Sequence, residues 1–434
     1  MPKISIIVPV YSVSEYLRRC LDSCVYQTFQ DIEVIVVNDS SPDERDGMII
    51  NEYEKTYPDR VRVFRHKKNL GVGEARKTAI RNACGEFLLF CDSDDFLDFT
   101  ACEKMYAYAV KCGADMVVCD YYYLRDGIIG IRQVSNGIDA AARDYCPYML
   151  TKTTVWVSLV KKSILVDNYL VSELRFGEDR IAVLWYLAAH KIAKIDEPLY
   201  YYVYRKSSLI GTATDRSAEE TVDAFYSVMQ HSYFEQLCNS AKCSVLFYAF
   251  RTLFGYWLNI MINDDKAELL PLFKKILRLE KIVDNYRSEI CMCGGIAWEA
   301  TRVNKILAFA EENMNSKDFN NRFREFYADM DFQIIAIVLE RLKMQLAGRC
   351  TVFWAAGSYS QVLANSLKLA GIEYEITDLH VKDNTKKRWD ELKCSTGIVL
   401  LSTSEFLGQV KRIVGDTEVI VLQDYLNEKM GAIL

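Results

Sequence analysis

Residues 87–95 read Phe87-Leu88-Leu89-Phe90-Cys91-Asp92-Ser93-Asp94-Asp95, an apolar run that ends in three carboxylates. Apolar runs of this kind are typical of buried strands in parallel sheets, whose ligand sites lie at the carboxyl ends of the strands. Clustered carboxylates repel one another unless a cation neutralises them, and oxygen ligands favour Mg²⁺ or Mn²⁺. We therefore predict a metal at Asp94 and Asp92. A solvated acidic turn is the alternative for so short a motif.

Three more strand-like runs precede this one, and polar residues follow each of them. Ile4–Val10 is rich in β-branched residues, and Ser12-Val13-Ser14-Glu15 predicts a capping box that opens a helix. Residues 32–37 are followed by asparagine and aspartate, and residues 61–64 lead to the glycine-containing segment 69–73. Segments with helical spacing of apolar residues lie between the strands. The alternation predicts an α/β fold with a doubly wound sheet and a nucleotide-type crevice.

The composition limits what the chain can be and what it can bind. With 434 residues, 50% of them hydrophobic, the chain is long enough for two or three domains. A formal net charge of −6 argues against non-specific nucleic-acid binding. The 14 cysteines show no zinc-ribbon spacing, and we interpret many as small buried hydrophobes in a reducing compartment. Examples in apolar positions are Cys20, Cys24, Cys91 and Cys119.

The sequence predicts a cytoplasmic protein. Lys3 is followed by a strand-like run and not by the apolar segment of a signal peptide. No apolar stretch approaches the roughly 18 residues that a membrane span needs, since the nearest candidate, 246–262, is interrupted by Arg251, Gly255 and Asn259. The aromatic residues of that segment favour a buried helical core, with peripheral contact at the inner face of the cell membrane as the alternative.

Five short motifs follow one another along the first part of the chain: Pro9-Val10-Tyr11, Asn38-Asp39, Asn69-x-Gly71, Ala75-Arg76 and Asp92-Ser93-Asp94-Asp95. Together they resemble the nucleotide-sugar-binding half of the family-2 inverting glycosyltransferases, which have the GT-A fold. The resemblance covers residues 1–215. It implies that the segment matching Pro9-Val10-Tyr11 lines a nucleobase pocket. It also implies that Asp39 accepts a hydrogen bond from the base and that Arg76 lies near the diphosphate.

The chemistry of the first two motifs fits those roles. The Tyr11 ring is able to stack on a pyrimidine, with a tyrosine that closes the rim of the core as the alternative. An ionised Asp39 accepts from an imide N–H, which uracil and thymine have and cytosine lacks. A UDP or dTDP donor is therefore preferred to CDP.

The next motifs suit the diphosphate. Asn69 and Gly71 precede a predicted helix, whose first backbone amides are able to face phosphate, and Arg76 adds a fixed charge. A simple turn is the alternative for the glycines. Asp92 and Ser93 are assigned to the same donor site.

A second acidic motif is Arg175-Phe176-Gly177-Glu178-Asp179-Arg180, which precedes an apolar helix predicted at 181–189. It is similar to the glycine–glutamate–aspartate motif of the family, whose aspartate is the general base. Inverting transfer needs a carboxylate that removes the proton of the acceptor hydroxyl. We therefore assign the base to Asp179, with Glu178 as a neighbour that holds the acceptor. An acidic first turn stabilised by the helix dipole is the alternative.

The segment Tyr204-Arg205-Lys206-Ser207-Ser208 follows a predicted strand and resembles the tyrosine–arginine loop of the family. Arg205 and Lys206 are expected to neutralise charge on the leaving diphosphate, with a solvated basic turn as the alternative. The chain departs from the membrane-embedded polymerases of the class, because it lacks spans and no Q-x-x-R-W follows the catalytic acid. Processive synthesis is therefore not expected.

Three domains are predicted. Residues 1–215 form the GT-A domain, 216–345 a helical domain or linker, and 346–434 a small Rossmann-like α/β domain. Residues 349–434 resemble the degenerate Rossmann-like modules appended to some bacterial glycan enzymes, because the expected phosphate loop keeps one glycine, Gly357. A structural or interaction role, oligomer formation included, is favoured over nucleotide binding. Asp378, at the spacing of a ribose-binding acid, keeps the second role open.

Two functions of different classes remain open. The first is a metal-dependent inverting glycosyltransferase that moves a sugar from a nucleotide-diphosphate donor to a hydroxyl of a glycan or lipid-linked acceptor in bacterial surface polysaccharide synthesis. The second is a non-catalytic sugar-nucleotide or glycan-binding protein that retains the crevice. Asp94, Asp179 and Arg76 together favour the enzyme, because a binding protein has no need of a base.

Overall fold

The computed structural model of the chain divides into two compact units, the first of which reaches Ala241 while the second begins at Lys242. The domain boundaries predicted near residues 215 and 345 stay predictions. Within the described residues, no helix has both the length and the apolar character that a membrane crossing requires. The described residues are 2–125, 128–132, 155–165, 180, 182–205, 215–262, 264, 267–291, 297–327, 330, 342–343, 346, 351–355, 363, 367, 372, 375–378, 398–401 and 418–422.

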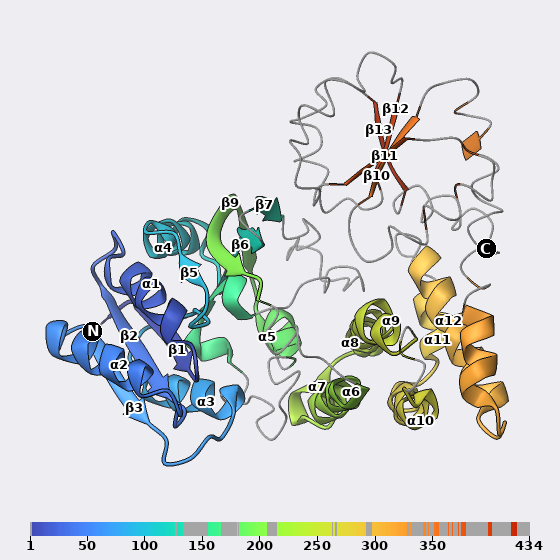
Figure 1. The fold of residues 1–434 in the computed structure, drawn as a ribbon, viewed down its shortest axis with the longest axis horizontal. Helices are drawn as coiled ribbons and strands as arrows, with labels where there is room; N and C mark the ends of the chain where they lie inside the picture. The colour runs from blue at the N-terminus through green and yellow to red at the C-terminus, as the bar shows by residue number, and fades with distance from the viewer. Residues whose placement is uncertain are drawn as a thin grey trace. The chain divides into compact units, whose positions relative to one another are not determined.

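The first unit is built on a sheet with the strand order β3-β2-β1-β4-β8-β6-β9-β5 (Figure 1). One half of this sheet is parallel and comprises β1 (Ile4–Val10), β2 (Ile32–Asn38), β3 (Val61–Arg65) and β4 (Phe87–Phe90). β1 and β4 are buried along their whole length, as expected for strands that helices cover on both faces. Because the four strands are parallel, the polar residues that follow them meet at one edge.

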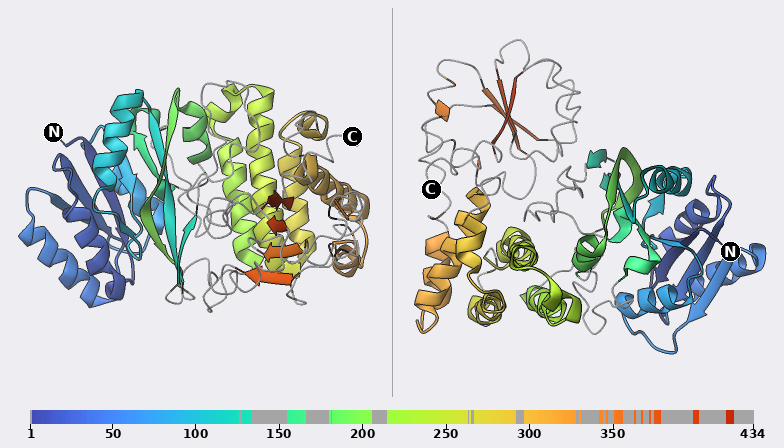
Figure 2. Two further views of the ribbon diagram at one scale, coloured as in Figure 1. Left: turned by 90° about the horizontal axis from the view of Figure 1, so that it is seen from above. Right: turned by 180° about the vertical axis from the view of Figure 1, so that it is seen from behind.

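The other half of the sheet is mixed. β8 (Ser158–Lys161) runs antiparallel to both β4 and β6 (Met116–Arg125). The long strands β6 and β9 (Ile192–Val203) are parallel and lie side by side, teal and green in Figure 2. The short strand β5 (Phe96–Leu97) pairs with β9, and β7 (Ile128–Arg132) pairs with β6. The predicted α/β class is confirmed, but the sheet as a whole is mixed because β8 reverses the strand direction.

Helices flank the parallel half of the sheet. α1 (Ser14–Val25) packs against α2 (Glu44–Thr56), whereas α3 (Val72–Asn82) packs on β1 and β2. α4 (Ala101–Cys112) packs on β6 and β9, and the short α5 (Ala182–Ala188) is almost entirely buried. α1 buries an apolar stripe at helical spacing, as the sequence predicts.

The capping box expected at residues 12–15 is wrong. α1 begins at Ser14, its N-cap is Val13, and no side chain caps it. Ser12 has a φ of 55°, in the left-handed region, and its N–H donates to Ser41 Oγ at 3.0 Å. The loop after β1 is therefore bound to the loop after β2, and this tertiary contact overrides the local capping preference.

Helices follow the mixed sheet, as predicted for the middle of the chain. The aromatic side chains of Phe247, Phe250 and Phe254 are fully buried, which agrees with the helical core favoured from the sequence. Two of these helices, α6 (Asp215–Met229) and α7 (Ser232–Gln236), lie in the first unit. The others are α8 (Asn239–Thr252), which spans the division at Ala241, and α9 (Leu258–Ile262), α10 (Leu269–Glu280), α11 (Tyr286–Cys291) and α12 (Ala297–Asn313).

The second unit also contains a small parallel sheet with the strand order β11-β10-β12-β13. Its strands are β10 (Thr351–Ala355), β11 (Glu375–Asp378), β12 (Ile398–Leu401) and β13 (Val419–Val421). A parallel sheet agrees with the α/β module predicted here. The Gly357 loop lies outside the described residues, so the Rossmann-like nature of this module stays a prediction.

A glycine tests how tightly β1 and the start of β4 are joined. Gly85 donates from its N–H to Ser5 Oγ at 2.8 Å, and a Cβ built there would lie 2.5 Å from the backbone nitrogen of Ser5. We expect Gly85→Ala to lower the free energy of unfolding by about 1–3 kcal/mol through this clash. Gly47→Ala in α2 is the matched control, since nothing lies within 4 Å of its Cβ. Urea denaturation decides, and equal stability of the two variants would contradict the packing argument.

Candidate active site

The loop after β4 holds four residues that we call the acid loop: Asp92, Ser93, Asp94 and Asp95. The N–H of Asp95 donates to the carbonyl of Asp92 at 2.9 Å, so the loop closes as a turn. Ser93 and Asp95 are buried, whereas the side chains of Asp92 and Asp94 are 27% and 19% exposed. The alternation leaves two carboxylates accessible and buries the other two side chains.

Asp95 anchors the acid loop to β9. Its carboxylate accepts hydrogen bonds from the Tyr200 hydroxyl and from the Val203 N–H, both at 2.7 Å. The same Tyr200 oxygen accepts from the Asp92 N–H at 3.1 Å. Burial raises the pKa of Asp95 well above its usual range, and the charges of Asp94 and Asp92 raise it further. Asp95 therefore holds the loop in place rather than offering itself to a ligand.

Asp92 is bound by an arginine of α3. Arg76 is only 4% exposed, and its Nη2 donates to Asp92 Oδ1 at 2.6 Å. α3 begins after Gly71, which has a φ of +89°. Residues other than glycine rarely adopt this backbone conformation. The structure thus brings Arg76, which the sequence predicts near a diphosphate, into contact with the acid loop.

Asp94 is bound by Arg205, although 111 positions separate the two residues in the chain. Arg205 donates from Nε to Asp94 Oδ2 at 2.8 Å and from Nη2 to the same oxygen. Its guanidinium also lies over the Tyr16 ring, 4.9 Å from the centroid. Burial raises the pKa of Asp94, the positive charge of Arg205 opposes this, and the charge of Asp92 adds to it. Arg205 therefore lies at the acid loop with a carboxylate as its partner, and its role toward a diphosphate stays a prediction.

Asp39 organises the loop that follows β3. It is buried, its Oδ1 accepts from the Leu70 N–H at 2.9 Å, and its Oδ2 accepts from the Gly71 N–H at 2.8 Å. His66 Nδ1 lies 2.6 Å from Oδ1, and the Gly71 N–H also donates to Asn69 Oδ1 at 2.9 Å. A carboxylate offers about four acceptor positions, and one on Oδ2 has no donor among the residues that the structure describes.

The sequence reasoning missed two residues of this region. His66 follows β3 directly and bridges Asp39 to Thr78 Oγ1, which lies 2.9 Å from Nε2. The rule that polar residues gather after parallel strands would have identified it. Asp46 is fully buried, and its Oδ2 accepts from Ser41 Oγ at 2.7 Å. No sequence pattern marks Asp46, because it lies inside the first turn of α2.

The predicted nucleobase residues lie at adjacent strand ends. Pro9 and Val10 are buried in β1, and Tyr11 follows with 44% of its surface exposed. The N–H of Asp39 donates to the carbonyl of Val10 at 2.9 Å, so the ends of β1 and β2 are tied together. Tyr11 and Asp39 are therefore neighbours along one edge of the sheet.

Three predicted site residues lie outside the described residues: Glu178, Asp179 and Lys206. Their roles as base, acceptor-holding neighbour and diphosphate contact stay predictions. The next residue of the acidic motif, Arg180, is described, and its guanidinium lies 5.9 Å from the centroid of the Phe225 ring.

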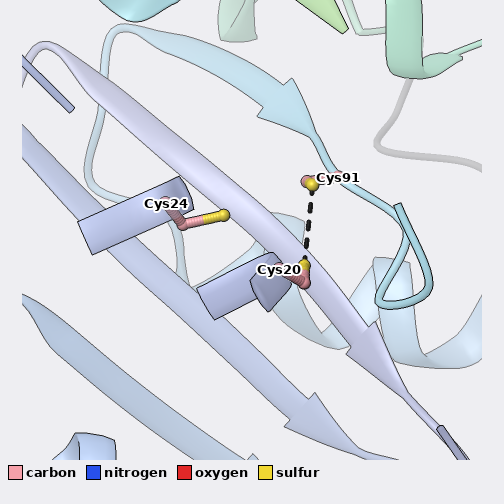
Figure 3. A group of neighbouring side chains, drawn as sticks. All are labelled: Cys20, Cys24 and Cys91. Atoms are coloured by element: carbon pink, nitrogen blue, oxygen red, sulfur yellow. Dashed lines mark hydrogen bonds between the residues drawn. The ribbon is translucent and has the colours of Figure 1, made fainter. Parts of the chain in front are cut away.

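Three cysteines lie close together, and one of them, Cys91, directly precedes the acid loop (Figure 3). The sulfur atoms of Cys20, Cys24 and Cys91 all lie within 4.8 Å of one another, and all three side chains are buried. Cys20 Sγ lies 3.7 Å from Cys91 Sγ and 3.6 Å from the carbonyl oxygen of Asp92. Hydrogen bonds from Cys20 and Cys24, together with burial, raise the pKa of Cys91 well above its usual range. The burial of all three side chains agrees with the interpretation of these cysteines as small buried hydrophobes.

A parallel sheet of order 3-2-1-4 with an acidic loop after its fourth strand, continued by a mixed half, is the arrangement of a GT-A-like domain. Comparison with known proteins identifies the family of this domain. Residues 5–159 match the model of glycosyl transferase family 2, so the chain carries a domain of this family.

Several bacterial glycosyltransferases are similar to this chain. Glycosyltransferase GlyA of Streptococcus pneumoniae is 32% identical over 235 residues, which are 51% of this chain but only 33% of GlyA. The Staphylococcus aureus poly(ribitol-phosphate) beta-N-acetylglucosaminyltransferase TarP is 25% identical over 71% of this chain and 98% of TarP. The crystal structure of S. aureus TarS 1-349 with UDP-GlcNAc superposes with a TM-score of 0.60 and 20% identity, covering 75% of this chain and 91% of TarS 1-349. This last likeness concerns the fold.

The anchor of the acid loop can be tested at Tyr200. Tyr200→Phe removes the hydroxyl that donates to the buried Asp95 carboxyl and accepts from the partly buried N–H of Asp92, so each of them loses a partner. We expect the free energy of unfolding to fall by about 1–3 kcal/mol. Tyr26→Phe is the control, because its hydroxyl pairs with Tyr57 on the exposed surface, and its effect should stay within about 0.5 kcal/mol. Urea denaturation of both variants checks the prediction, and a Tyr200→Phe protein as stable as the wild type would contradict it.

Proposed function

We propose that this protein transfers a sugar from a nucleoside diphosphate, preferably UDP, to a hydroxyl group of a bacterial surface glycan or lipid-linked acceptor, with inversion at the anomeric carbon. One observation carries the proposal. Two accessible carboxylates, Asp92 and Asp94, lie at the carboxyl end of β4 with an arginine on each. Such a site offers the charges that a diphosphate and its counter-ion require.

The relatives support a donor and an acceptor of this kind. TarS, which shares the fold, forms a complex with UDP-GlcNAc. TarP, which aligns along nearly its whole length, is named for the transfer of N-acetylglucosamine to poly(ribitol-phosphate). A UDP-sugar donor and a polyol-phosphate or glycan polymer of the cell envelope are therefore the substrates we propose here.

The nucleobase assignment rests on Tyr11 and Asp39. The exposed Tyr11 ring suits stacking on a flat pyrimidine. The position left on Asp39 Oδ2 is an acceptor, and it suits the imide N–H of uracil. Cytosine offers no proton there, which is why we propose UDP rather than CDP.

The acid loop fits a divalent cation. The arginine contacts use Oδ1 of Asp92 and Oδ2 of Asp94, so the other oxygen of each carboxylate takes no part in them. Mg²⁺ and Mn²⁺ bind to one or two carboxylates and take their other ligands from substrate phosphates and water. When bound, such an ion would neutralise charge on the leaving diphosphate.

The remaining chemistry belongs to side chains of the chain. Arg76, fixed by burial, holds Asp92 in position beside the diphosphate. Arg205 and Lys206 are proposed to neutralise the diphosphate as it leaves. Asp179 is proposed to take the proton of the acceptor hydroxyl as its oxygen attacks from the face opposite the leaving group, and Glu178 to hold the acceptor.

The metal assignment predicts the behaviour of Asp94→Asn. The amide keeps the size of the carboxylate but loses its charge, so Mn²⁺ stimulation and most turnover should disappear while the fold persists. Asp196→Asn is the control, because that carboxylate is 76% exposed and faces Lys194. UDP release from a panel of UDP-sugars is measured in Mn²⁺ and in excess EDTA. Equal turnover of Asp94→Asn and wild type under both conditions would remove the metal from the proposal.

The base assignment predicts different outcomes for the two neighbouring acids. Asp179→Asn preserves shape but cannot accept a proton, so turnover should fall on the order of 10²–10⁴-fold while donor binding stays near wild type. Glu178→Gln, the matched variant one position away, should lose less turnover. Turnover and donor affinity are measured for both. The reverse ranking would make Glu178 the base, and normal donor binding without any turnover in the wild type would indicate a non-catalytic binding protein.

A further inference from the structure

Each carboxylate that we assign to the metal is already bound by an arginine. Arg76 holds Asp92, and Arg205 holds Asp94 with two donors on one oxygen. A cation that binds these carboxylates therefore comes close to guanidinium groups that already pair with them. Binding of a metal and a diphosphate therefore depends on whether these arginines give up their carboxylates.

The two arginines differ in how they are held. Arg76 lies within α3 and its side chain is 4% exposed, so its position is fixed by packing. Arg205 comes two positions after the end of β9 and its side chain is 17% exposed. Its guanidinium also lies over the face of the Tyr16 ring. This cation–π contact is attractive but forms no hydrogen bond. Arg205 is therefore the arginine that is able to change partner.

Arg205 and a divalent cation compete for the same carboxylate. Both donors of Arg205 converge on Asp94 Oδ2, and two positive charges that share one carboxylate repel each other strongly where water is partly excluded. The planar fork of an arginine also matches the oxygens of a phosphate. A diphosphate thus offers Arg205 a partner equivalent to the one that it gives up.

We propose that Arg205 is a positioning residue that occupies Asp94 in the donor-free protein and transfers to the diphosphate when the donor binds, which releases Asp94 for the metal. This inference rests on the proposed function, in which the acid loop binds a metal and a nucleoside diphosphate. Arg205 thereby couples the two ligands: each raises the affinity of the protein for the other by the same factor. Binding of the metal in the absence of the donor is disfavoured, so the metal enters the site only when the donor is present.

Mn²⁺ binding to metal-free protein, followed through the electron paramagnetic resonance of free Mn²⁺, tests the proposal without measuring activity. In the wild type, UDP should raise the affinity for Mn²⁺ roughly 5- to 150-fold, the range typical of coupled sites. Arg205→Ala should bind Mn²⁺ alone more tightly than the wild type does, and UDP should raise that affinity by a smaller factor. Arg205→Lys should lie between them, because a lysine offers a point charge in place of the fork.

Arg18→Ala is the matched control. Arg18 also forms a two-donor pair with a carboxylate, that of Glu52, but on the exposed surface of α1 and α2. Its removal should leave Mn²⁺ binding unchanged. If Arg205→Ala is not folded by circular dichroism, Arg205→Gln, which keeps much of the side-chain length, takes its place.

The outcomes separate this inference from the proposed function. In one outcome, the wild type binds Mn²⁺ together with UDP, but Arg205→Ala without UDP binds Mn²⁺ no more tightly than the wild type does. This outcome overturns the inference and leaves the proposed function standing. A wild type that binds no Mn²⁺ even with UDP overturns both the metal assignment and the inference. Tighter Mn²⁺ binding by Arg205→Ala with a reduced UDP effect supports it.

Discussion

The buried carboxyl of Asp95 is the contact on which the rest of the site depends. A carboxyl group in the protein interior is costly unless its oxygens are hydrogen-bonded, and Tyr200 and the Val203 N–H satisfy both of them. This binds the acid loop to the end of β9, more than a hundred positions further along the chain. Because β9 leads directly into Arg205, the same contact brings the guanidinium to Asp94. The site is therefore complete only when the mixed half of the sheet has formed.

The charges of the acid loop are balanced before any ligand is present. Arg76 and Arg205 pair with Asp92 and Asp94, and Arg19 donates to the carbonyl of Asp94 at 3.2 Å. Partly buried pairs of this kind are screened by salt much less than surface pairs, and they hold their side chains in one orientation. In the proposed function, an incoming diphosphate and its cation would replace existing ionic contacts instead of entering an empty and repulsive cluster.

The edge of the sheet that holds Tyr11 and Asp39, to which we assign the nucleobase, is organised by hydrogen bonds between loops. Asp39 connects the ends of β1 and β2 to the loop after β3, and His66 extends this connection to Thr78. Ser41 and Asp46 tie the loop after β2 to the turn before α1. These contacts explain why the local rule for a capping box fails here, since the serine expected to cap α1 has its backbone N–H bound to a neighbouring loop.

The sequence by itself determined the parallel strands, the helices between them and the position of the acid loop, because apolar runs that end in polar residues are local patterns. It also marked Asp39, Arg76 and Arg205 as site residues, through motifs that resemble those of the family. Only the tertiary structure decided the partners: Asp39 with His66, Asp95 with Tyr200, and Asp94 with Arg205. These contacts join residues that are 27, 105 and 111 positions apart. They follow from the strand order and from the reversal of direction at β8. Both are set by strand pairing across the whole sheet, which no local sequence pattern encodes.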